Sequence, residues 1–365
     1  MPKTIGIAVI GYGYWSPKLI RNIRNNPGFK LIAICEKDPA RHAAIASEHP
    51  DVAIEDEYRA VFERSDVDAV IIATIPSSHF RIAKQALDAG KHVLVEKPLV
   101  LSIAEGEILL NIAHTRGLTL MVDHTYLYSP AIQSLQSLVR EGKLGKIYSI
   151  ESVRVNLGLF QRDSNVVWDL APHDISILLS LFDEKPYAVS VVGSKTVVHP
   201  SLKHGQESIA HIMLYYKSGF VAHVHVSWIS PVKVRQITVI GSDRMAQYDQ
   251  LAVDQLRIFD HGVYASDQGQ ESGPLFAYKT GDITPVAVPA GSEDLAAMLG
   301  DFQSAIQEGK TPVSNADLGL DVVRILVAAQ RSLQKKGKKV RISYRSSNKI
   351  MQHIREMFTR MRHGY

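Results

Sequence analysis

Residues 5–16 read Ile-Gly-Ile-Ala-Val-Ile-Gly-Tyr-Gly-Tyr-Trp-Ser, an apolar run followed at once by a glycine-rich turn. The run predicts a strand buried on both faces, and the amphipathic stretch after it predicts a helix. In a strand–turn–helix of this kind, the first glycine permits the tight turn and the second lets the backbone approach a pyrophosphate, which the helix N-terminus attracts. Ser16 stands where a third glycine is usual, and the alternative interpretation is a plain glycine turn. We expect a dinucleotide to bind this turn, at Gly11, Gly13, Tyr14 and Trp15.

The same alternation continues through residues 1–123, which we expect to form one domain. Apolar runs predict strands at 5–10, 30–35, 69–73, 92–95 and 118–122. Amphipathic segments between them predict helices at 17–25, 39–48, 58–63, 78–89 and 103–116. Each crossover has room for one helix, so the pattern predicts a parallel, doubly wound Rossmann sheet, an α/β fold.

The pattern changes in residues 124–345, which we expect to form a second, α+β domain. Longer alternating strands predict an open, mostly antiparallel sheet, with helices at 130–141, 170–181, 294–307 and 316–335. Residues 261–292 are punctuated by glycine and proline, which predicts a loop. Residues 346–365 form a basic amphipathic tail beyond this domain.

Composition limits the class of protein. The 365 residues are 45% hydrophobic and 21% charged, which is typical of a folded chain long enough for two domains. Cys35 is the single cysteine, which excludes a disulfide scaffold or a cysteine-based zinc cluster and favours a reducing compartment. No apolar run approaches the roughly 18 residues of a membrane span. We therefore expect a cytoplasmic protein.

The net charge of +4 is unevenly distributed. Residues 335–365 hold ten of the 41 basic residues and one of the 37 acidic residues, so this segment carries +9. The rest of the chain has 31 basic and 36 acidic residues, a balance of −5. A mildly acidic body gives no reason to expect a nucleic-acid partner.

Glu36 ends the second predicted strand, 25 residues after Gly11. A carboxylate at this position can accept hydrogen bonds from the adenosine ribose hydroxyls and repel a 2′-phosphate, which favours NAD over NADP. The alternative is a solvated acid at a strand end. Lys37 and Arg41 lie close enough in sequence to soften the exclusion of NADP.

Polar residues follow two further predicted strands. One segment, 73–79, reads Ala-Thr-Ile-Pro-Ser-Ser-His, and the other, 95–98, reads Val-Glu-Lys-Pro. Open α/β sheets bind ligands at the C-terminal ends of their strands. We expect five residues of these segments to contact the cofactor: Thr74, Pro76, His79, Glu96 and Lys97.

With these motifs in this order, residues 4–343 resemble the glucose–fructose oxidoreductase, inositol dehydrogenase and rhizopine-catabolism (Gfo/Idh/MocA) family. The second-domain signature is also present, as Trp-Asp-Leu-Ala-Pro-His-Asp at 168–174. The resemblance implies that Asp169 and His173 face the nicotinamide, and their i, i+4 spacing places both on one helix face. In the family a proline usually follows the threonine directly, whereas here it comes at Pro76.

The resemblance assigns catalysis to Lys97, Asp169 and His173. His173 would act as the general base, Lys97 would stabilise charge on the same substrate oxygen, and Asp169 would orient His173 or hold a neighbouring hydroxyl. Taken alone, His173 could equally be a buried structural histidine. His223 and His225 lie on one face of a predicted strand, but no third ligand has metal-site spacing, so we expect no metal.

The segment before the signature, 154–165, is polar and basic. Its side chains could hold the hydroxyls, carboxylate or diphosphate of a substrate, or could be a solvated loop. We expect substrate contacts from Arg154, Arg162, Asn165 and His173. The amino-acid sequence of 154–169 is similar to that of family members that act on nucleotide-linked sugars.

These observations leave three hypotheses for function. The first is an NAD-dependent sugar dehydrogenase or ketoreductase whose substrate is a nucleotide-linked hexose or uronic acid. The second is a free inositol or monosaccharide dehydrogenase. The third is a non-catalytic, NAD-binding regulatory protein, which would have no need for a proton-transfer group.

The second sheet and the tail each predict a packing partner. One sheet face would expose apolar residues such as Val192, Met213, Tyr215 and Val224, so we expect a homodimer or homotetramer through this sheet. In the tail, apolar residues recur with helical period from Ile350 to Met361. We expect this stripe to pack on protein; association with an anionic membrane is the alternative.

Overall fold

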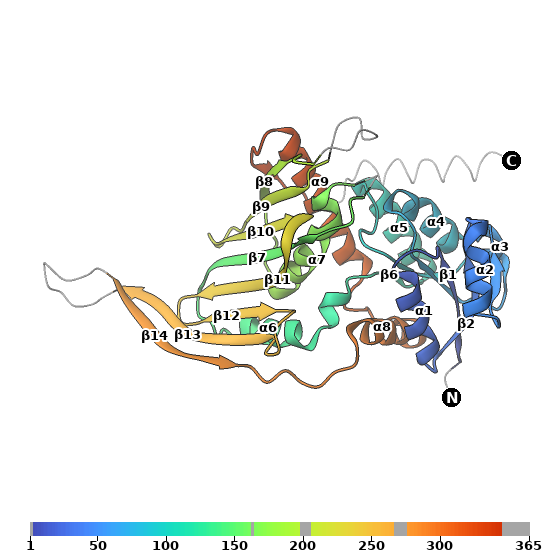
Figure 1. The fold of residues 1–365 in the computed structure, drawn as a ribbon, viewed down its shortest axis with the longest axis horizontal. Helices are drawn as coiled ribbons and strands as arrows, with labels where there is room; N and C mark the ends of the chain where they lie inside the picture. Colours follow the sequence, from blue (N-terminus) through green and yellow to red (C-terminus); the bar gives the residue numbers. More distant parts are fainter. Residues whose placement is uncertain (1–2, 162–163, 198–205, 266–275, 345–365) are drawn as a thin grey trace, which may run out of the picture.

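The computed structural model describes residues 3–161, 164–197, 206–265 and 276–344. They form two domains, each built on one β-sheet, joined side by side (Figure 1). The tail and Arg162 lie outside the described residues, so their expected roles stay predictions. Within the described part of the chain, no helix combines the length and apolar content that crossing a bilayer requires.

The first sheet has six strands in the order β3-β2-β1-β4-β5-β6, and all its pairs are parallel. Its strands are β1 (Ile5–Ile10), β2 (Phe29–Cys35), β3 (Ala53–Glu55), β4 (Ala69–Ile72), β5 (His92–Val95) and β6 (Leu120–Val122). The crossover helices are α1 (Ser16–Asn25), α2 (Pro39–Glu48), α3 (Tyr58–Glu63), α4 (Pro76–Asp88) and α5 (Ile103–Arg116). The doubly wound parallel sheet is confirmed, with one short edge strand, β3, added. The strand order reverses direction between β1 and β4, which opens a ligand crevice there.

The second sheet has nine strands in the order β14-β13-β12-β11-β7-β10-β9-β8-β15, and only β7 and β10 pair in parallel. Its strands are β7 (Ile147–Leu157), β8 (Ala188–Ser194), β9 (Ile209–Tyr215), β10 (Val221–Ser227), β11 (Ile229–Gly241), β12 (Met245–Asp249), β13 (Leu256–Ala265), β14 (Phe276–Pro285) and β15 (Val340–Arg341). The helical segments are the 3₁₀ helix η1 (Thr125–Tyr128), α6 (Pro130–Arg140), α7 (Val166–Leu181), α8 (Asp294–Glu308) and α9 (Ala316–Gln334). The mostly antiparallel sheet is confirmed.

The prediction of a loop over 261–292 is wrong for 261–265 and 276–285, which are strands; 286–292 has no regular structure, as predicted, and 266–275 lie outside the described residues. Strands β13 and β14 form a hairpin that projects away from the first domain (Figure 1). The side chains of β14 are largely exposed, Tyr278 at 75% and Phe276 at 57%, and those of β13 from Arg257 to Gly262 are half-buried. Without a fully buried face, the hairpin lacks the alternation that marks strands in a sequence.

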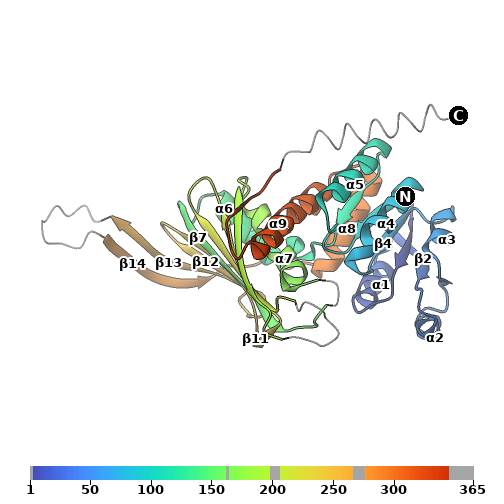
Figure 2. The same cartoon turned by 90° about the horizontal axis from the view of Figure 1, so that it is seen from above.

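One face of the second sheet is covered and the other is open. Helices α7 and α9 lie between this sheet and the first domain (Figure 2). Buried and partly exposed side chains alternate along β9 and β10, as expected for a sheet covered on one side. Val192, Met213 and Tyr215 lie on the open face, whereas Val224 is fully buried against the helices. The prediction that Val224 lies on the exposed face is therefore wrong.

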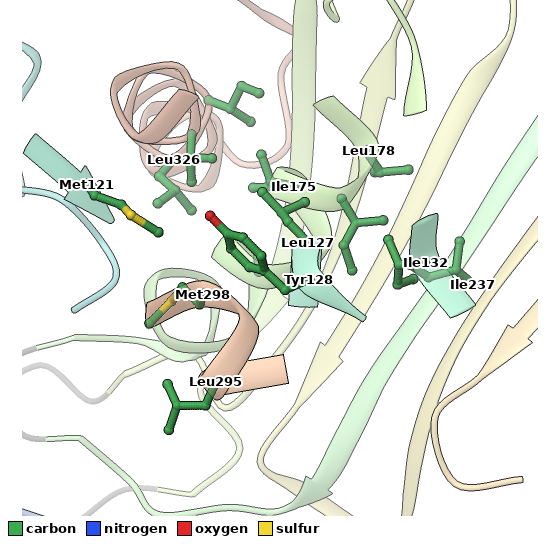
Figure 3. Packing of buried hydrophobic residues seen from close by; sticks show 14 of the residues in the cluster. Met121, Leu127, Tyr128, Ile132, Ile175, Leu178, Ile237, Leu295, Met298 and Leu326 are labelled. Carbon is green, nitrogen blue, oxygen red and sulfur yellow. The ribbon is translucent and has the colours of Figure 1, made fainter. Parts of the chain in front are cut away.

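A continuous apolar core joins the two domains. Helix α8 packs on α1 and η1, and α9 packs on α5, β6 and β8. Met121 of β6, Tyr128 of η1, Ile175 of α7, Met298 of α8 and Leu326 of α9 belong to one buried cluster (Figure 3). Helices α8 and α9 therefore hold the second domain against the first.

Candidate active site

The glycine-rich turn has the geometry that a dinucleotide needs. Gly11 has a φ of +97°, and a Cβ there would lie 2.7 Å from the carbonyl oxygen of Ala73, so glycine is required. The Ser16 hydroxyl donates to the Gly11 carbonyl oxygen (2.8 Å) and accepts from the Gly13 N–H (3.1 Å). Ser16 is fully buried, so it closes the turn in the place of a third glycine. Tyr14 is 79% exposed beside it.

Glu36 closes the far end of the same region. Its carboxylate accepts from the backbone N–H groups of Tyr12 (2.8 Å) and Asp38 (3.0 Å). Arg41 lies 3.5 Å from this carboxylate and donates to the Tyr12 carbonyl oxygen at 2.7 Å. Backbone donors thus hold the carboxylate in place, while Arg41 brings a positive charge beside it, as the sequence analysis allowed.

The segment after β4 is shaped by a buried histidine. Pro76 opens α4, and Thr74 and Pro76 line the cleft described below. His79 is fully buried, with Nδ1 2.9 Å from the Pro98 carbonyl oxygen and Nε2 3.1 Å from the Thr74 carbonyl oxygen. It does not line the cleft. It lies beneath the loops that follow β4 and β5 and contacts a backbone carbonyl oxygen of each.

Glu96 and Asp123 form a carboxyl pair at the floor of the site. Burial raises the pKa of Glu96 well above its usual range, and the nearby Asp123 carboxylate raises it further. Asp123 accepts from the Trp15 indole N–H at 3.0 Å. Glu96 Oε1 has no hydrogen-bond partner among the described residues. The Glu96–Asp123 pair and the Trp15–Asp123 bond therefore connect the glycine-rich turn with the segment after β5. Asp123 was not anticipated.

Lys97 and Asp169 bring the two domains together. Lys97 Nζ lies 2.8 Å from the carbonyl oxygen of Asp169 and 3.1 Å from its Oδ1. The indole N–H of Trp228 donates to Asp169 Oδ2 at 2.8 Å. Lys97 and Trp228 thus hold the carboxylate. Among the described residues, no hydrogen bond joins it to His173, so the expected orienting role is not seen. Asp169 instead positions the Lys97 ammonium group.

His173 is half-buried beside Tyr126, with 4.9 Å between the ring centroids. Its Nδ1 has no hydrogen-bond partner among the described residues. Burial lowers the pKa of His173 well below its usual range, and the charges of Lys97 and Arg154 lower it further. The imidazole is therefore neutral at neutral pH, the state in which it can accept a proton.

Two of the expected substrate contacts have structural roles instead. Arg154 is buried in an ion pair with Asp174, at 2.6 Å, and does not line the cleft. The Asn165 side chain caps α7, accepting from the N–H groups of Val167 and Trp168. This cap begins the helix at Val166, four residues before the predicted start.

Asn156 of β7, within the polar segment 154–165, lines the cleft as well. Three further lining residues were missed by sequence reasoning: Tyr126 of η1, Trp228 between β10 and β11, and Arg235 of β11. Nothing in the local sequence distinguishes them from ordinary strand and turn residues, because distant segments bring them together.

The glycine-rich turn, Glu36, Lys97, Asp169 and His173 open into one cleft of about 1840 Å³ between the domains. Gly11, Gly13 and Glu36 line its adenosine end, and Lys97, Asp169 and His173 line its other end. The helix N-terminus, the anchored carboxylate and the orphaned Glu96 oxygen fit a dinucleotide laid along the C-terminal edge of the first sheet.

The three strand histidines lie on the open face of the second sheet, far from this chemistry in the fold. His211 of β9 stacks on His225 at 4.4 Å and lies within hydrogen-bonding distance of His223, at 3.2 Å. His211 was not anticipated. Within the described residues, no group of three or more His, Cys, Asp or Glu side chains is arranged to hold a metal ion.

Comparison with known proteins agrees with this geometry. Residues 5–124 match the oxidoreductase family with an NAD-binding Rossmann fold, and residues 132–247 match the GFO/IDH/MocA C-terminal domain. The uncharacterized oxidoreductase YdgJ of Escherichia coli is 31% identical over 66% of this chain and 70% of its own.

Two further relatives have names that indicate an activity or a ligand. The UDP-N-acetylglucosamine 3-dehydrogenase of Acidithiobacillus ferrooxidans is 32% identical over 54% of this chain and 60% of its own. Its crystal structure superposes with a TM-score of 0.73 at 25% identity, covering 91% of this chain and 98% of that one. GenD2 from gentamicin A biosynthesis, solved in complex with NAD, shares the fold at 20% identity and a TM-score of 0.78, covering 94% of this chain and 97% of that one. On the family matches, the chain belongs to the Gfo/Idh/MocA oxidoreductases, and its first domain is an NAD-binding Rossmann domain.

Proposed function

We propose that the chain is an NAD-dependent dehydrogenase or ketoreductase acting on a ring hydroxyl or keto carbon of a sugar. The observation that carries the proposal is the meeting of Lys97 with Asp169 and His173 at one end of the cleft. A neutral imidazole facing the cleft and an anchored ammonium group are what abstraction of a hydroxyl proton requires. A protein that only sensed the cofactor would need neither.

Each residue has a separate part in the oxidative direction. When bound, NAD supplies the hydride acceptor of the reaction. His173 accepts the hydroxyl proton, since its low pKa keeps it neutral in the cleft. Lys97 donates a hydrogen bond to the same oxygen and stabilises its developing negative charge. Asp169 and Trp228 hold Lys97 in place from the second domain.

The substrate we propose is a nucleotide-linked hexose or uronic acid. The cleft, at about 1840 Å³, is larger than the several hundred Å³ of an ordinary ligand pocket. It therefore has room for a substrate with a carrier group beside the cofactor. The named activity of the Acidithiobacillus ferrooxidans relative supports this class. A free polyol or monosaccharide is the second candidate, supported by the relatives named D-apiose dehydrogenase and scyllo-inositol 2-dehydrogenase.

A substrate panel followed by NADH absorbance tests the proposal. We expect oxidation of at least one nucleotide-linked sugar, and both Lys97→Ala and His173→Ala should lower kcat by about 10²- to 10⁴-fold. NAD affinity, measured by calorimetry, should stay within about threefold of wild type, because the adenosine contacts are intact. Wild-type turnover by both variants would show that the catalytic assignment is wrong.

We also propose that the open face of the second sheet packs against a second copy of the chain. Val192 is 57% exposed on this face, and Met213 and Tyr215 lie beside it. Light scattering at micromolar concentration should give two or four times the chain mass of 40.4 kDa. A monomer would contradict this proposal and leave the catalytic one unaffected.

A further inference from the structure

The charges at the substrate end of the cleft do not balance. The Lys97 ammonium group is paired with Asp169, and the buried Arg154 is paired with Asp174. Arg235 of β11 lines the same part of the cleft, and no described carboxylate lies within ion-pair distance of it. One positive charge is therefore left facing the space that a substrate would fill.

Arg235 is held rigidly in this position. Its Nη1 donates to the carbonyl oxygens of Val155 and Val234, each at 2.9 Å, and its Nη2 donates to Asn156 Oδ1 at 2.5 Å. These bonds use three of the five N–H groups of a guanidinium. A further N–H group interacts with the Tyr126 side chain, so the guanidinium is fixed in orientation and keeps one N–H group, together with its positive charge, for an anion.

Neighbouring groups make this charge costly without a ligand. The pKa of Arg235 is lowered, first by burial and then by the charge of Arg154. The Arg154 guanidinium carbon lies 4.4 Å from the centroid of the Tyr126 ring, and that ring packs against His173. Asp294 and Glu293 also line the cleft, and burial and the charge of Glu293 raise the pKa of Asp294; neither carboxylate forms an ion pair with Arg235 among the described residues.

We propose that Arg235 binds an anionic group of the substrate, either a carboxylate on the sugar ring or the diphosphate of a nucleotide carrier. This inference rests on the proposed function, since it names the chemistry that the same site would select. Arg235 and His173 both line this cleft. The anion would therefore bind in the same cleft as the imidazole. A neutral, unlinked sugar would leave the guanidinium desolvated and unpaired, so the site would reject it.

Calorimetry on the NADH-loaded protein separates the two sources of negative charge. Four ligands are compared: D-glucose, D-glucuronate, UDP-glucose and UDP-glucuronate. In wild type we expect at least one anionic class to bind about 10- to 100-fold more tightly than its matched neutral ligand. Arg235→Gln should remove that advantage, and Arg235→Lys should restore part of it. Arg244→Gln is the matched control, because Arg244 is an exposed arginine in the turn between β11 and β12, paired with Asp260.

The pattern of loss identifies the ligand group. A loss confined to the glucuronate-bearing ligands assigns Arg235 to a carboxylate, and a loss confined to the UDP-linked ligands assigns it to a diphosphate. Equal weakening of all four ligands, no change in any, or no binding by any overturns the anion site. Binding without oxidation by NAD would contradict the proposed function while leaving the anion site in place.

Discussion

Protonation of His124 should make the stability of the first domain strongly dependent on pH. His124 follows β6, is 1% exposed, and has no hydrogen-bond partner for either ring nitrogen among the described residues. Burial lowers its pKa to about 3, and the charge of Lys97 contributes. In the unfolded chain its pKa would be about 6.5. Below pH 6.5 the unfolded chain therefore takes up a proton that the folded chain cannot.

The sign and size of the effect follow from this difference. The stability that His124 contributes is complete above pH 6.5 and is lost as the pH falls toward 3. Between pH 8 and pH 5 the loss from this one group is about 2 kcal/mol. His124→Leu removes the titrating ring and fills a similar volume. The variant should therefore lose about 2 kcal/mol less than wild type over the same interval.

Urea unfolding followed by tryptophan fluorescence at pH 8, 6.5 and 5 measures the difference. His114→Gln, an exposed histidine in the last turn of α5, is the control and should lose as much stability as wild type. Histidine-ring NMR gives a second measurement, in which the His124 signal should not titrate between pH 8 and 5. The reasoning is refuted if the leucine variant loses as much stability as wild type, or if the His124 signal titrates near pH 6.5.

Three further predictions concern single contacts. Glu36→Ala should narrow or reverse a preference for NAD over NADP, and calorimetry showing that wild type binds NADP more tightly would contradict the role of this carboxylate. Asp174→Asn should lower the free energy of unfolding by about 3–5 kcal/mol, because it leaves the buried charge of Arg154 unpaired; urea titration measures this. Trp228→Phe removes the donor to Asp169 and should lower kcat by about tenfold with unchanged NAD affinity, as steady-state kinetics and calorimetry can show.

The parts of the fold that sequence predicts well are those set by local pattern. The apolar runs of β1, β2 and β4 have no polar alternate face, so their burial in a parallel sheet follows directly. Gly11 marks its turn because only glycine tolerates the observed φ of +97°. Lys97 could be placed because it follows a buried strand, at the edge where such sheets bind ligands.

The parts that sequence missed depend on pairing between distant segments. Arg154 and Arg235 lie directly opposite each other on β7 and β11, yet one is buried against Asp174 and the other lines the cleft. Their local sequences carry no signal of this difference, since the helix packed on the sheet decides it. Asn165 looked like a substrate contact because polar residues precede the signature, but its amide is used to begin α7.

The placement of the reacting groups depends on the junction between the domains. Lys97 belongs to the first domain, and both atoms that anchor it belong to Asp169 of the second. A shift of about 1 Å between the domains would break these bonds and misplace the ammonium group. The buried cluster around Tyr128 and Met298 opposes such a shift, because it packs elements of both domains into one core (Figure 3). Tyr128 also donates to Asp301 of α8 at 2.6 Å. The Lys97–Asp169 pair is therefore organised without a ligand, and closure of one domain on the other is not needed to assemble it.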